Sequence, residues 1–146
     1  MNWIADINQL AQDLPKLHNN FFLTITEKDF YERVEKLKSL EKDLNIYSMV
    51  VELSKLIALA GDDHTALEIP KNNMLPMEYY WFEEGIYITG TTPEFEEVLH
   101  QKVIEIEGME ISEVIEKMAE MISHENMQFV KSKSLNCWFA RIFYTA

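Results

Sequence analysis

The sequence predicts an α+β protein in which three N-terminal helices are followed by a small, mostly antiparallel sheet and further helices. Two changes of hydrophobic period carry this prediction. Up to about residue 60, apolar side chains recur every three or four positions, as on the buried face of an amphipathic helix. After Pro70 they alternate with polar residues, as in strands with one buried face, and from Ser112 onward the helical spacing returns.

Three helices are expected in the first 60 residues. We expect Pro15 to end the first helix near Leu14, because proline lacks an N–H donor and clashes with the preceding turn. Thr26 and Asp29 form a variant of the capping box at the start of the second helix, and the third spans residues 46–60. The inward residues of the first two helices are Trp3, Ile7, Leu10, Leu14, Leu17, Phe30, Val34, Leu37 and Leu40. An antiparallel bundle over residues 1–70 follows.

The run Gly61-Asp62-Asp63-His64-Thr65 separates the third helix from a short strand expected at residues 65–69. Glycine tolerates the left-handed backbone that often ends a helix, and Pro70 stops the strand. The run therefore predicts a tight corner that carries two carboxylates and an imidazole. Such a corner either only connects the helix to the strand or also presents a catalytic group.

Residues 71–126 are expected to form a β-rich unit. Two pairs of alternating segments, each joined by a short glycine-containing turn, predict two hairpins. The expected elements are strands at 77–82, 86–89, 102–106 and 109–111, a helical turn at Pro93–Glu97, and a helix that Ser112 caps.

Residues 127–146 are expected to form an apolar C-terminal helix. Its stripe consists of Leu135, Trp138, Phe139, Ile142 and Phe143. An apolar face of this kind is expected to be buried against another surface. We therefore expect this helix to fold back onto the bundle, to pair with a second copy in a homo-oligomer, or to link to a domain beyond these residues.

Composition excludes some classes of function. The net charge of −12 repels phosphate backbones and anionic lipid, so neither nucleic acid nor membrane is expected as a partner. One cysteine among 146 residues allows neither an intrachain disulfide nor a thiolate metal cluster. The N-terminus lacks the pattern of a signal peptide, so we expect a cytoplasmic chain; an extracytoplasmic location stays open if a leader was removed.

Four short segments of the chain carry a resemblance to known proteins: His18-Asn19-Asn20-Phe21-Phe22, residues 61–65, residues 81–109 with Lys102-Val103-Ile104-Glu105-Ile106-Glu107-Gly108-Met109, and residues 122–126. Through them the chain resembles the N-terminal region of the tail-specific (C-terminal-processing) and tricorn-like serine peptidase family. The first segment is similar to the family's His-Pro-Asn-x-Phe turn, and the second to its Gly-Asp-Gly-His-Thr. The third resembles its Gly-x-x-(Val/Ile)-x-x-Ile-Asn-Gly-Met segment, and the fourth is also similar to the family.

The resemblance implies a reduced PDZ-like element within residues 71–126 and a general-base role for His64. The stretch from Met77 to Ile111 is too short for a complete PDZ domain. Asp63 replaces the family's glycine and Asn19 its proline. The family's nucleophile-bearing domain is absent from these residues, and no serine here lies in a Gly-x-Ser-x-Gly elbow.

His64 and Asp62 are the candidate catalytic residues. An imidazole titrates near neutral pH and can accept a hydroxyl proton, while a carboxylate such as Asp62 can orient it. The alternative is that both residues tie the corner together through backbone hydrogen bonds, and without a nucleophile we favour that interpretation. Asp62, Asp63 and His64, with His18, His100 or His124, offer suitable ligand types for a metal ion. No His-x-x-x-His spacing is present, however, so no metal or cofactor is expected.

The aromatic cluster of the first hairpin allows two interpretations. Its residues are Tyr79, Tyr80, Trp81, Phe82 and Tyr87. We favour a packed core against the bundle and the fourth helix. The alternative is an exposed edge that binds an extended peptide by strand addition, with Tyr80, Phe82, Lys102 and Ile104 as candidate contacts.

These observations lead to three hypotheses of function. The first is a non-catalytic scaffold that guides substrate chains in a serine-peptidase-like protein, with polypeptide substrate or the missing catalytic domain as partner. The second is a stand-alone peptide-binding or partner-binding module that uses a sheet edge. The third is a dimerising interaction protein that associates through Leu135, Trp138, Phe139 and Ile142.

Overall fold

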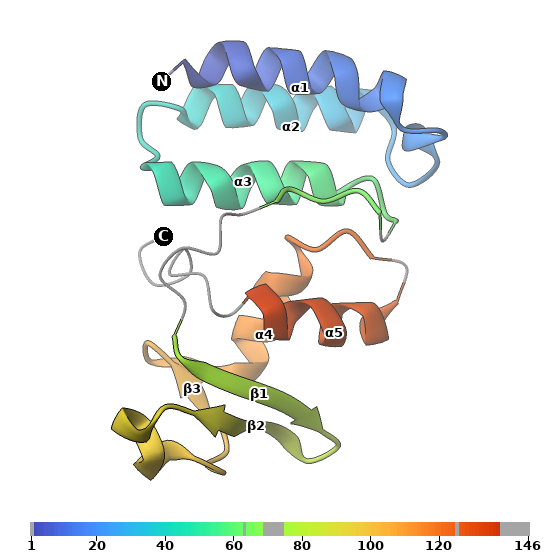
Figure 1. Ribbon diagram of the computed structural model, residues 1–146. Helices are drawn as coiled ribbons and strands as arrows, with labels where there is room; N and C mark the ends of the chain where they lie inside the picture. Colours follow the sequence, from blue (N-terminus) through green and yellow to red (C-terminus); the bar gives the residue numbers. More distant parts are fainter. Residues whose placement is uncertain (1, 63, 69–74, 125, 138–146) are drawn as a thin grey trace.

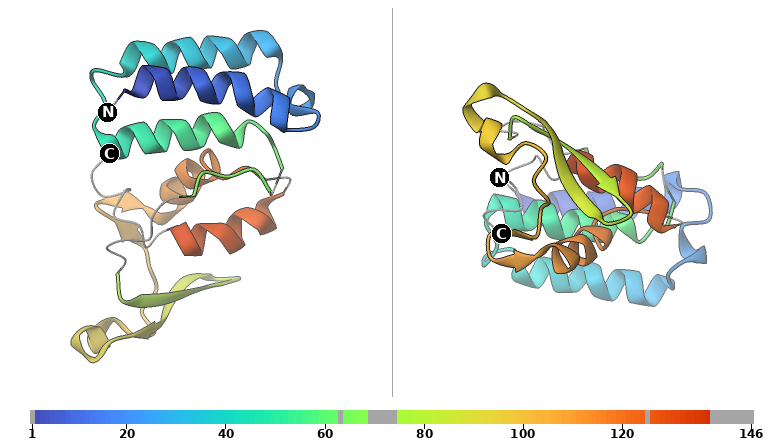
Figure 2. Two further views of the ribbon diagram at one scale, coloured as in Figure 1. Left: turned by 45° about the horizontal axis from the view of Figure 1, so that its top comes forward. Right: turned by 90° about the horizontal axis from the view of Figure 1, so that it is seen from below.

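The computed structural model describes residues 2–62, 64–68, 75–124 and 126–137. Its elements, in chain order, are α1 (Trp3–Leu17), η1 (Phe21–Leu23), α2 (Glu27–Leu40), α3 (Ile46–Ala58), β1 (Met77–Phe82), β2 (Gly85–Thr91), η2 (Pro93–Val98), β3 (Glu105–Ile106), β4 (Met109–Glu110), α4 (Ile111–Ala119) and α5 (Met127–Cys137). Helices α1, α2 and α3 are stacked at one end, the β1–β2 hairpin lies at the other, and α4 and α5 lie between them (Figures 1 and 2). The predicted α+β class is confirmed.

Polar side chains fix the start of each bundle helix. Asn2 accepts a hydrogen bond from the Ala5 N–H at 3.2 Å, and Asn45 accepts one from the Ser48 N–H at 2.9 Å. The predicted cap of α2 is confirmed: Thr26 Oγ1 accepts from the Asp29 N–H at 3.1 Å and donates to the Asp29 carboxylate at 2.7 Å. These contacts satisfy backbone donors that have no partner inside the helix.

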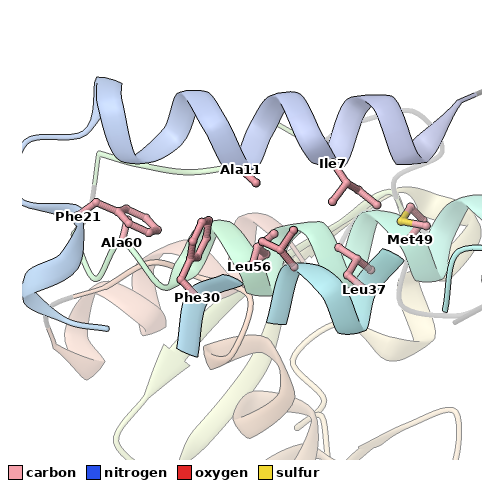
Figure 3. Packing of buried hydrophobic residues seen from close by; sticks show 9 residues of the cluster. Ile7, Ala11, Phe21, Phe30, Leu37, Met49, Leu56 and Ala60 are labelled. Carbon is pink, nitrogen blue, oxygen red and sulfur yellow. The ribbon is translucent and has the colours of Figure 1, made fainter. Parts of the chain in front are cut away.

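The core of the bundle lies where α1, α2 and α3 face one another (Figure 3). Its buried members are Ile7, Ala11, Phe21, Phe30, Val34, Leu37, Met49, Leu56 and Ala60. The predicted inward stripe of α2 supplies three of them, Phe30, Val34 and Leu37. Full burial of each large apolar side chain contributes about 1.5–3 kcal/mol, so this face holds the bundle together.

The prediction that α1 ends near Leu14 is wrong, because α1 continues to Leu17 with Pro15 inside it. Proline removes one hydrogen bond donor, but at this position only the last turn is affected. The His18 N–H still donates to the Leu14 carbonyl at 3.0 Å and closes that turn. Leu14 also packs against the bundle core, which favours the helical backbone over a break.

The first predicted hairpin is confirmed, with β1 and β2 paired antiparallel around the Glu83–Glu84 turn. Its register shifts next to Glu78, and Thr89 is the extra residue of the bulge on β2. The far edge of β2 is covered by residues 100–103: the His100 N–H donates to the Ile88 carbonyl at 2.8 Å, and the Val103 N–H donates to the Ile86 carbonyl at 2.8 Å. The outer edge of β1 pairs with no strand among the described residues.

A second, smaller core joins the hairpin to α4. Ile86 and Met118 are buried at its centre, with seven partly buried neighbours: Tyr79, Trp81, Val103, Ile106, Ile111, Val114 and Ile115. The second predicted hairpin is present but short, since only residues 105–106 and 109–110 pair. The prediction that Ser112 caps α4 is wrong: the helix begins at Ile111, and no side chain of its cap residue Glu110 bonds the first turn.

Two further expectations concern the ends of the bundle and of the chain. Residues 65–68 form no strand, because they pair with no other segment in the part of the chain described; Ile69 lies outside that part.

Helix α5 begins at Met127, but Trp138, Phe139 and Ile142 lie outside the described residues, so dimerisation through them and Leu135 stays a prediction. None of the helices described combines the length and the apolar character needed to cross a membrane.

Candidate functional site

The corner after α3 requires a glycine. Gly61 has φ +71°, and an added Cβ would lie 2.7 Å from the Thr24 methyl carbon. Thr24 cannot easily retreat, because its hydroxyl donates to the Leu59 carbonyl at 2.6 Å, one of the carbonyl groups left open at the end of α3. The chain therefore turns sharply and places Asp62 beside the end of the bundle.

The Asp62 carboxylate accepts hydrogen bonds from both neighbouring and distant residues. Its Oδ1 accepts from the His64 N–H at 2.6 Å and from the Thr65 N–H at 2.9 Å. Its Oδ2 accepts from the Thr65 hydroxyl at 2.9 Å and pairs with Nε2 of His18. Asp62 thus organises the corner and also holds it to the C-terminal end of α1.

Ser123 joins the corner from a third segment. The Asp62 N–H donates to the Ser123 Oγ at 3.0 Å, and the Ser123 side chain is buried in the turn between α4 and α5. His18, Asp62 and Ser123 are 44 and 61 residues apart along the chain, so these contacts are long-range. They bring together one residue from each of three of the four segments that carry the sequence resemblance; the fourth, residues 81–109, takes no part in these contacts.

The His18 ring is held by Asp62 at Nε2 and by packing against Phe21. Its Nδ1 is buried and has no hydrogen-bond partner within the described residues, and its ring meets Phe21 edge-on at 5.7 Å. We assign a proton to Nε2, because a carboxylate can only accept, so the contact with Asp62 requires Nε2–H as the donor. Phe21 in turn packs on Phe30 at 4.9 Å, which connects the corner to the bundle core.

Hydrogen bonding sets the charge of Asp62. Partial burial alone would raise the pKa of its carboxyl group, but the hydrogen bonds from His18, the His64 N–H and Thr65 outweigh that effect and lower the pKa to about 2. Asp62 is therefore ionised at neutral pH.

His64 is exposed at the surface of the corner. The sequence hypothesis assigns Asp62 the task of orienting the His64 imidazole, whereas in the structure Asp62 binds the His64 backbone N–H and the His18 ring. Chemically, the corner presents one imidazole to solvent on a backbone that a carboxylate holds in place. Across the residues described, no three His, Cys, Asp or Glu side chains are placed to bind a metal ion, and Asp63 lies outside them.

The candidate peptide-binding residues lie in another part of the chain: Tyr80 and Phe82 are in β1, whose hairpin lies at the opposite end of the molecule from α1, α2 and α3 (Figure 1). The core interpretation is right for Tyr79 and Trp81, which pack toward Ile86 and Met118, and wrong for Tyr80 and Phe82. Those two are 56% and 42% exposed, because alternation along β1 points them away from α4.

Lys102 and Ile104 are placed differently from Tyr80 and Phe82. Lys102 pairs with Tyr87 as an isolated bridge, and its side chain covers Gly85, where an added Cβ would lie 2.5 Å from its Cε. Ile104 is 65% exposed. The structure therefore brings Tyr80, Phe82 and Tyr87 together as one aromatic group, with Lys102 at its margin.

Comparison of the chain with protein-family models, with curated proteins and with solved structures finds no significant match. The site is therefore interpreted from its own geometry. Sequence reasoning missed the His18–Asp62 pair and the contact with Ser123. Their signal was present, since each residue lies in a segment that resembles the same family, but periodicity alone does not report which loops meet.

Proposed function

We propose that this chain, which is not catalytic on its own, is the N-terminal scaffold of a serine-peptidase-like protein of the tail-specific or tricorn-like kind. One observation supports the proposal: residues from three of the four segments that resemble this family meet at Asp62, whose carboxylate pairs with His18 and whose backbone N–H donates to Ser123. The nucleophile is supplied by a domain outside these residues.

In this proposal the corner holds His64 for proton transfer. Asp62 fixes the backbone at residue 64, and the exposed imidazole accepts the proton of a serine hydroxyl from the catalytic domain. A general base of this kind contributes about 10²–10⁴-fold to a rate. His18 and Ser123 do not touch substrate; they position Asp62.

The test begins with the natural reading frame. The proposal expects this frame, or an adjacent one, to encode a serine-containing domain, and the reconstituted protein to cleave polypeptides. His64→Ala should then lower kcat about 100-fold or more while Tm changes little, because alanine keeps the N–H that Asp62 binds. The absence of any such coding sequence, or cleavage by the purified 146-residue chain alone, would overturn the proposal.

A second candidate function, partner binding by the β1–β2 hairpin, is favoured by a separate observation. The outer edge of β1 has no strand partner among the residues described, and Tyr80 and Phe82 are exposed beside it. An extended peptide can add a strand to such an edge. A peptide library presented to the whole chain tests this function, and a lack of enrichment for any extended sequence would count against it.

A further inference from the structure

The outward face of the β1–β2 hairpin carries a group of aromatic rings that the small core does not use. Tyr80 and Phe82 have ring centroids 4.5 Å apart, and Phe82 meets Tyr87 edge-on at 5.5 Å. The opposite face of the same hairpin holds the buried residues Ile86 and Ile88. The three rings are therefore additional to the packing that stabilises the hairpin.

Three glutamates lie next to the aromatic residues along the chain, and one of them, Glu84, lines the same hollow as Phe82 and Tyr87. Glu78 precedes Tyr80 and Phe82 on the same face of β1, and its side chain lies across Gly90. Glu83 and Glu84 form the exposed turn directly after Phe82. Within the described part of the chain, none of these three carboxylates has an ion-pair partner, although other surface glutamates such as Glu35 and Glu113 pair with lysines.

A hollow of about 230 Å³ lies beside the rings. It is lined by Phe82, Glu84, Tyr87, Ile88, Thr89 and His100. Aromatic faces carry partial negative charge and attract cations, and an adjacent carboxylate strengthens that attraction. The walls of the hollow therefore suit the long, partly apolar side chain of lysine or arginine with its charge near Glu84.

We propose that the hairpin face formed by Tyr80, Phe82, Tyr87 and Glu84 binds a lysine or arginine side chain of an extended peptide. This inference rests on the second proposed function, partner binding by the hairpin, and specifies the chemistry of the partner. Charge complementarity supports a basic partner, since the chain carries a net charge of −12. Of the lysines that touch the hairpin, Lys102 covers Gly85, and Lys131 lies over the ring of Trp81, which packs against the small core. A peptide carboxylate would meet glutamates here.

The test uses three blocked peptides with the same alternating threonine framework. One carries lysine at every second position, one carries norleucine and one carries glutamate. Calorimetric titration into the whole chain should show the lysine peptide binding at least about three-fold more tightly than the norleucine peptide, with weaker binding at high salt. The glutamate peptide should bind most weakly.

Variants of the hairpin then locate the interaction. Phe82→Leu and Tyr80→Leu keep an apolar side chain but remove the ring, so each should reduce the preference for lysine about two- to five-fold. Glu84→Gln should reduce it and flatten the salt dependence. Glu32→Gln on α2 is the matched control, since its exposed ion pair with Lys28 lies in the bundle, and it should change nothing.

The outcomes separate the two proposals. Equal binding of the lysine and norleucine peptides, or a lysine preference that survives both leucine substitutions, would overturn the cation site while partner binding by the hairpin stands. Failure of all three peptides to bind would overturn both. Because Tyr80 and Phe82 are exposed, Tm of the leucine variants should stay close to that of the parent chain, which shows that lost binding does not reflect unfolding.

Discussion

At the scale of single residues, Asp62 makes more contacts that fix the backbone than its neighbours do. Asp62→Ala should lower the free energy of unfolding by about 2–4 kcal/mol, because the change leaves His18, two backbone N–H groups and the Thr65 hydroxyl without their acceptor. Denaturant titration measures this loss. His64→Ala serves as the control: if it destabilised the chain as much as Asp62→Ala, the corner would depend on the imidazole instead.

The lowered pKa of Asp62 also predicts how stability depends on pH. The folded-state pKa of about 2 lies below the ordinary value of 3.8, so the folded state favours the ionised carboxylate. The resulting stabilisation, about 1–2 kcal/mol, is present above pH 4 and is lost as the pH falls from about 4 to about 2. Comparing Tm across this range for the parent chain and Asp62→Asn should show a smaller acid-induced loss in the variant.

Which single residues matter was only partly predictable. The sequence indicated that Asp62 and His64 belong to one corner, because glycine and the end of the apolar stripe locate the turn. It could not indicate that the partner of Asp62 is His18, since a contact across 44 residues depends on how α1 and α3 pack. The exposure of Tyr80 and Phe82 was the less favoured of two interpretations for a related reason: alternation tells which residues share a face, but not which face the core covers.

At the scale of elements, the end of α3 can be tested through its glycine. Gly61→Ala should destabilise the chain by about 2–3 kcal/mol, because alanine is strained at φ +71° and its Cβ would collide with Thr24. Gly108→Ala is the matched comparison: φ is +78° there, but nothing lies within 4 Å of the added Cβ, so only the backbone strain of about 1 kcal/mol applies. Equal losses in the two variants, measured by urea unfolding, would exclude the Thr24 contact as a constraint.

Most elements followed from hydrophobic period and capping residues, and the errors share a cause. The caps of α2 and the turn of the first hairpin depend on neighbours in sequence, so they were predictable. The end of α1 and the expected strand at residues 65–69 depend on tertiary contacts: packing of Leu14 holds a helical turn around Pro15, and residues 65–68 find no strand to pair with. At the end of α1, tertiary packing overrode the tendency of proline to end a helix. At residues 65–68, the extended propensity of the sequence produced no strand because no neighbouring strand pairs with it.

At the scale of the whole molecule, two separate cores are joined in part by the bond from the Asp62 N–H to Ser123. Among the described residues, the bundle core has nine buried members and the hairpin core has two, so the hairpin, α4 and α5 should open at lower free energy than the bundle. Native-state hydrogen exchange should therefore show earlier exchange in β1, β2 and α4 than in α2 and α3.

Ser123→Ala tests whether the corner couples these two parts. The substitution leaves the partly buried Asp62 N–H without an acceptor, so stability should fall by about 1–2 kcal/mol, and exchange in α4 should accelerate more than exchange in α2. Ser112→Ala, at an exposed position on α4, should leave both rates unchanged. If Ser123→Ala instead accelerated exchange equally throughout the chain, the two cores would unfold as one unit, and the corner would contribute stability without acting as the joint between them.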